Sequence, residues 1–127
     1  MKQRIEVTGA VRENDRMIFQ AQPFEESDLA GLTAVGQVLA DSDQLSFIYI
    51  LDYQEEFIYA NLPSKIWPEL KETLDSSIPA YLAVNGLAIE LKDLHDELSA
   101  LLENIKGNAN YGEEMERRAV ETFGLED

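Results

Sequence analysis

Two consecutive segments of the chain are apolar at almost every position, and this pattern constrains the fold more than any other. The segments span residues 45–51 and 57–62, and the polar-rich residues 52–56 join them. A strand that is apolar on both faces must be covered on both sides, by helices, by closure into a barrel or by another subunit. We therefore expect a hairpin at the centre of a sheet, and a homodimer if the helices cover only one face.

Shorter patterns predict two more hairpins. Asn85-Gly86 between two apolar runs favours a type I′ turn, and residues 12–16 contain Asn and Asp, which tolerate turn conformations. The expected hairpins are residues 4–8 with 17–21, and residues 80–84 with 87–91.

The segment before the apolar pair is open to two interpretations. Ser27 could cap a helix, but Gly31 and Gly36 would each destabilise that helix by about 1 kcal/mol. We assign a strand to residues 34–39.

Helical periodicity is strongest in the last half of the chain. Residues 64–76 predict a helix with Pro68 in its first turn, and a second helix runs from about residue 92 to a stop at Gly107. A last helix is expected over residues 113–123. The sequence therefore predicts one α+β domain over residues 1–127. Its antiparallel sheet is a meander of about six or seven strands, with one helix before the last hairpin and two C-terminal helices.

The charge balance excludes several classes of partner. The chain has 10 basic and 25 acidic residues, a formal net charge of −15. This sign repels phosphate backbones and anionic lipids, so we expect no nucleic-acid or membrane binding. The absence of Cys and of an apolar leader favours a cytoplasmic protein.

The acidic residues are unevenly distributed. No Lys, Arg or His occurs between Arg16 and Lys65, where eight carboxylates lie in the predicted connections. A meander would place some of them at each end of the sheet. Asp41 and Asp43 are expected at one end, and Asp52, Glu55 and Glu56 at the other. The remaining three, Glu25, Glu26 and Asp28, are not assigned to either end.

The sequence offers no convincing catalytic, cofactor or metal site. His95 is the only histidine, has no nucleophile in a known local motif, and is read as a helix-surface residue. Asp41-Ser42-Asp43 resembles the start of a calcium-binding loop, but the other ligands of such a loop are missing. We therefore interpret these residues as a turn. We assign no catalytic, cofactor-binding or metal-binding residue.

Residues 107–114 connect the last two helices and contain two Asn and one Tyr. They can be read simply as a helix end followed by a helix start, or as a recognition loop carrying Asn108, Asn110 and Tyr111. With Asp52, Glu55 and Glu56, these are the candidate partner-binding residues.

Two functional hypotheses follow. The first is a non-enzymatic interaction module, a small adaptor or regulator whose acidic surface binds a basic protein surface. The alternative is a small-ligand-binding domain or hydrolase-like enzyme, with a pocket near Tyr49, Tyr59, Trp67, His95 and Tyr111. Acidic charge can also serve solubility alone.

Two blocks of the sequence resemble the YjbL-like uncharacterised protein family of Bacillus-type Firmicutes. The blocks are Asp41-Ser42-Asp43 with Leu45-Ser46-Phe47 and Tyr49-Ile50-Leu51, and Glu103-Asn104-Ile105 with residues 107–114. The resemblance implies a bacterial cytoplasmic protein. It supplies no catalytic residues, because the family has no assigned activity.

Overall fold

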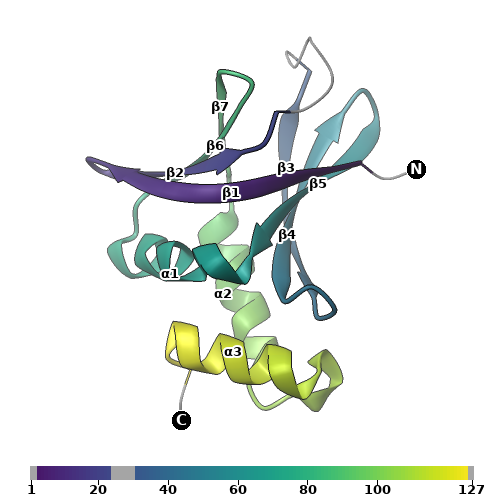
Figure 1. Cartoon of the computed structure of the whole chain (residues 1–127), viewed down its shortest axis with the longest axis vertical. Helices are drawn as coiled ribbons and strands as arrows, with labels where there is room; N and C mark the ends of the chain where they lie inside the picture. Colours follow the sequence, from purple (N-terminus) through teal and green to yellow (C-terminus); the bar gives the residue numbers. More distant parts are fainter. Residues whose placement is uncertain (1–2, 24–30, 126–127) are drawn as a thin grey trace.

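A computed structural model describes residues 3–23 and 31–125 of the chain (Figure 1). The strands are β1 (Gln3–Glu13), β2 (Arg16–Ala21), β3 (Thr33–Asp41), β4 (Ser46–Tyr53), β5 (Glu56–Pro63), β6 (Ala80–Val84) and β7 (Leu87–Glu90). The helices are α1 (Trp67–Ser76), α2 (Leu94–Ile105) and α3 (Glu113–Phe123), with short 3₁₀ turns η1 (Ser64–Ile66) and η2 (Ala109–Tyr111) before α1 and α3. The expectations for Glu25, Glu26, Ser27 and Asp28 lie outside the described residues.

The α+β class is confirmed, but the purely antiparallel meander is wrong. The described strands form a mixed sheet in the order β3-β4-β5-β1-β2-β6-β7. β1 pairs parallel to β5, and β2 pairs parallel to β6. The β1–β2 hairpin therefore occupies the middle of the sheet, where we had expected the β4–β5 hairpin. The connection through η1 and α1 carries the chain from β5 past the β1–β2 hairpin to β6, which therefore runs antiparallel to β5 and parallel to β2.

All three helices lie on the same side of a strongly bent sheet (Figure 1). The two edge strands, β3 and β7, approach each other, and α2 packs along β3. Side chains from the inner face of the sheet and from the helices form one buried core. The helices thus cover only one face of the β3–β4–β5 meander.

Several local predictions are confirmed. Asn85 and Gly86 have φ angles of 49° and 79°, as a type I′ turn requires. Pro68 lies in the first turn of α1, and Gly107 follows α2 with φ 70°. The strand assigned to residues 34–39 falls within β3. In each case the residues that decide the structure are close together in the sequence.

Tyr49 ties β4 to the segment between β7 and α2. Its side chain is fully buried, and its hydroxyl donates a hydrogen bond of 2.6 Å to the Lys92 carbonyl. Burial raises the pKa of Tyr49 well above its usual value, and the nearby charges of Asp93 and Glu90 raise the pKa further. The neutral hydroxyl is therefore the form that the fold stabilises.

Tyr49→Phe is expected to lower the free energy of unfolding by about 1 to 2 kcal/mol, because the hydrogen bond from the buried Tyr49 hydroxyl to the Lys92 carbonyl is lost. The raised pKa adds a pH dependence. The stabilisation that the Tyr49 hydroxyl gives to the folded state is fully present below about pH 10, the pKa of an unfolded tyrosine. It is lost as the pH rises above this value, because the unfolded chain ionises more readily than the folded one. Urea denaturation of both proteins at neutral and at alkaline pH measures the difference. A difference that stays the same at alkaline pH contradicts this account.

Candidate functional site

An apolar strip lies on the outer face of the sheet, the face opposite the helices. Successive residues of a strand point to opposite faces, so Phe47, Tyr49 and Leu51 enter the core while their neighbours point outward. The register then aligns the outward side chains of three strands. We call these residues the outer strip: Leu39 of β3, Ile48 and Ile50 of β4, and Phe57 and Tyr59 of β5.

The outer strip is partly open to solvent. Its middle is buried, since Ile48 and Ile50 are each only 3% exposed. Its two margins are open, with Phe57 55% and Leu39 37% exposed. The side of the strip next to β1 is polar, because Asn61 donates a hydrogen bond of 2.8 Å to Glu6 there.

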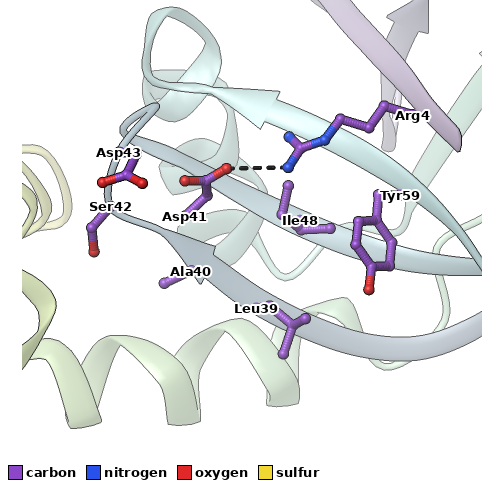
Figure 2. Close-up of a pocket in the computed structure, with 8 residues that line it drawn as sticks. All are labelled: Arg4, Leu39, Ala40, Asp41, Ser42, Asp43, Ile48 and Tyr59. Atoms are coloured by element: carbon purple, nitrogen blue, oxygen red, sulfur yellow. Dashed lines mark hydrogen bonds and ion pairs between the residues drawn. The ribbon is translucent and has the colours of Figure 1, made fainter. Parts of the chain in front are cut away.

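An open depression of about 360 Å³ adjoins one end of the strip (Figure 2). Arg4 and Asp41 face each other across it, with Nη2 and Oδ2 3.4 Å apart, while the Tyr59 ring lies to one side of them. Its volume is at the lower limit of ligand pockets, which are about 300 to 1,000 Å³. The lining residues are Arg4, Leu39, Ala40, Asp41, Ser42, Asp43, Ile48 and Tyr59.

Carboxylates lie at both ends of the outer strip. Asp41 pairs with Ser46 at the start of β4, whereas Asp52 pairs with Phe57 near its end, beside the turn that holds Glu55. The six residue steps from Ser46 to Asp52 separate the two ends by about 20 Å. Asp41 is neutralised by Arg4, but the ion pairs between described residues do not involve Asp43, Asp52, Glu55 or Glu56. The expected division of the acidic residues into two ends therefore holds for these five.

The connector residues lie near only one of these ends. Asn108 supports the connector itself, because its side-chain oxygen accepts a hydrogen bond of 3.0 Å from the Asn110 backbone. Tyr111 is half-buried, and its carbonyl accepts a hydrogen bond from the Ser42 hydroxyl. The connector, residues 107–114, thus packs against the β3–β4 turn. This contact brings together the two sequence blocks on which the family resemblance rests. The six predicted partner-binding residues do not form one site, since Asp52, Glu55 and Glu56 lie at the far end of β4.

The predicted aromatic pocket is wrong. Tyr49 and Trp67 lie inside the core with no exposed surface, whereas Tyr59 points to the opposite face of the sheet. One cleft cannot include all three, because the sheet lies between them. His95 is half-buried in the first turn of α2. Among the described residues no group of three potential metal ligands occurs, and no helix is long and apolar enough to cross a bilayer.

The outer strip is not predicted as a site from the sequence. The sequence places Leu39, Ile48 and Phe57 in strands as apolar residues and Arg4 in a strand as a polar residue, without assigning them a shared surface. The available signal was the apolar character of both faces of residues 45–51 and 57–62, which required a second cover that the helices do not supply.

Comparisons with known proteins place the chain in a family. A family model described as a family of unknown function, UPF0738, matches residues 5–123. UPF0738 proteins of Bacillus licheniformis and Bacillus pumilus are 45% and 44% identical, and the UPF0738 protein YjbL of Bacillus subtilis is 42% identical. Each match covers 97% of this chain and 99% of the relative. No solved structure matches the chain. The chain therefore belongs to the UPF0738 family.

Proposed function

We propose that the chain is a non-enzymatic interaction module, a small adaptor or regulator that binds a protein partner through the outer strip. The observation that carries this proposal is the solvent exposure of two large apolar side chains, Phe57 and Leu39, at the two margins of the outer strip. Exposed apolar surface bordered by polar residues is typical of interaction sites. A strand that is apolar on both faces is explained if the second face is covered by a partner.

The charge of the molecule favours a basic protein partner. Carboxylates lie at both ends of the outer strip, and the basic residue that lines it, Arg4, is already paired with Asp41. Opposite charge on a partner would increase its association rate, whereas nucleic acid and anionic membranes carry the same sign as this chain. A cytoplasmic location is part of the proposal, in keeping with a sequence that has no Cys.

A second copy of the chain is the other protein that could cover the strip. The condition for the expected homodimer is met, because the helices lie on one face of the sheet. The net charge of −15 opposes this pairing, since it would bring like charges together. Sedimentation equilibrium at two salt concentrations decides between a monomer and a dimer, and a dimer that dissociates on Phe57→Ser would identify the second copy as the partner.

Phe57→Ser is expected to abolish capture of partner proteins from a Bacillus lysate, because it removes the most exposed apolar side chain of the strip. Val11→Ser is the matched control. Val11 is 40% exposed, but it lies on β1 beside β2, outside the outer strip. Quantitative mass spectrometry should show proteins that wild type and Val11→Ser retain and Phe57→Ser loses. Identical protein sets for all three baits contradict the proposed function.

A further inference from the structure

The dimensions of the outer strip match one α-helix. The strip extends about 20 Å along β4 between the acidic ends, and three strands spaced about 4.8 Å apart make it about 10 Å wide. A helix is about 10 to 12 Å in diameter and rises 1.5 Å per residue, so about 14 residues would cover the strip. Helices already cover the inner face of the same strands, and a helix on each face of a sheet is a common layer arrangement.

The charges specify what kind of helix fits. Asp43 lies at one end of the strip, and Asp52, Glu55 and Glu56 at the other, without ion pairs to described residues. A helix that places Lys or Arg near both of its ends would meet both groups, and an apolar stripe between them would contact the strip. The chain's own helices do not fit, because acidic residues occupy the first turns of all three.

We propose that the partner segment is an amphipathic helix of about 14 residues with basic side chains near both ends, bound along β4 on the outer strip. The apolar side chains of this helix contact Leu39, Tyr59 and Phe57. Its basic side chains pair with the carboxylates at the two ends. This inference rests on the proposed function, and it specifies the partner's chemistry and its direction on the surface.

A synthetic peptide provides the probe. It is acetylated and amidated, about 14 residues long, with Leu at helical spacing on one face, two Lys in the first turn, two Lys in the last turn, and Ala elsewhere. A second peptide of the same composition has its four Lys residues in the middle of the polar face. A third has the same Lys positions and a scrambled Leu stripe. Fluorescence anisotropy measures the binding of each peptide to the full chain.

Two triple variants test the acidic end formed by Asp52, Glu55 and Glu56. Neutralising Asp52, Glu55 and Glu56 together (D52N, E55Q, E56Q) is expected to weaken binding of the first peptide about tenfold, because three ion pairs are lost together. The control triple D96N, E97Q, E103Q removes the same charge from exposed positions on α2. It is expected to weaken binding less than about twofold, because those residues do not face the peptide.

The possible results separate the two proposals. Tighter binding of the first peptide than of the other two, with loss confined to the β4–β5 triple, supports the basic helix. Equal binding of the three peptides, equal loss in the two triples, or no binding overturns it. If Phe57→Ser still loses partners that Val11→Ser retains, the interaction module survives that failure and only the helical partner is excluded.

Discussion

Trp67→Ala is expected to lower the free energy of unfolding by about 4 kcal/mol, close to the largest effect of any single truncation in a core. Trp67 has no exposed surface, and its ring lies 4.8 Å from that of Phe47 and 6.0 Å from that of Phe123. It joins β4 to the helix layer. The indole N–H also donates a hydrogen bond of 3.1 Å to the Leu62 carbonyl. Alanine would leave a cavity and remove the hydrogen bond to the buried Leu62.

Trp67→Phe separates the two contributions. It keeps most of the aromatic contact with Phe47 and Phe123 but removes the hydrogen bond, so a smaller loss of about 2 kcal/mol is expected. Trp67 is the chain's only tryptophan, so circular dichroism must follow the urea denaturation of all three proteins. A loss below about 1 kcal/mol for Trp67→Ala would contradict a central role for this ring, given a total stability of about 5 to 15 kcal/mol.

Gly36→Ala is expected to destabilise the fold by about 2 to 3 kcal/mol. Gly36 has a φ angle of 98°, a conformation in which residues with a side chain are strained by about 1 to 3 kcal/mol. It lies where the β3–β4 register shifts between Ala34 and Val38. An added Cβ would lie 3.0 Å from Asp93 Oδ2 and 3.5 Å from the Lys92 carbonyl. The substitution thus strains the backbone and crowds the segment that leads into α2.

Gly86→Ala is the matched control for backbone strain. Gly86 has a φ angle of 79°, but nothing lies within 4 Å of an added Cβ. We expect a loss of about 1 kcal/mol there, and the excess at Gly36 measures the contact with Lys92 and Asp93. Asp93→Ala in the Gly36→Ala background should recover part of that excess by removing the carboxylate. Equal losses at the two glycines would show that this contact is unimportant.

The sequence was sufficient for the parts of the fold that neighbouring residues determine. Asn85-Gly86 predicts its hairpin because both positions need a positive φ, and Gly107 predicts the end of α2 for the same reason. The parallel pairings could not be predicted in this way. β1 meets β5 with Ile5 beside Ala60, and no turn connects these residues or encodes their register.

The outer strip was hidden for a related reason. Ile48 and Tyr49 are adjacent, both apolar and both almost fully buried, so the sequence does not distinguish the face that meets the helices. The helices decide this, because all three pack on one side of the sheet. The acidic ends could be anticipated because turns connect antiparallel strands at alternate ends, which depends only on local hairpins. The aromatic pocket failed because shared residue type does not indicate a shared face.

The central place of the β1–β2 hairpin has a consequence for biosynthesis. β1 and β2 are made before their neighbours β5 and β6, which end at Pro63 and Val84. A two-stranded hairpin is only marginally stable alone in water, and each open strand edge is a template for pairing with another chain. The sheet can close only after most of the chain has left the ribosome. Until then, both edges of the hairpin are open to other nascent chains, and incomplete translation products should aggregate most readily.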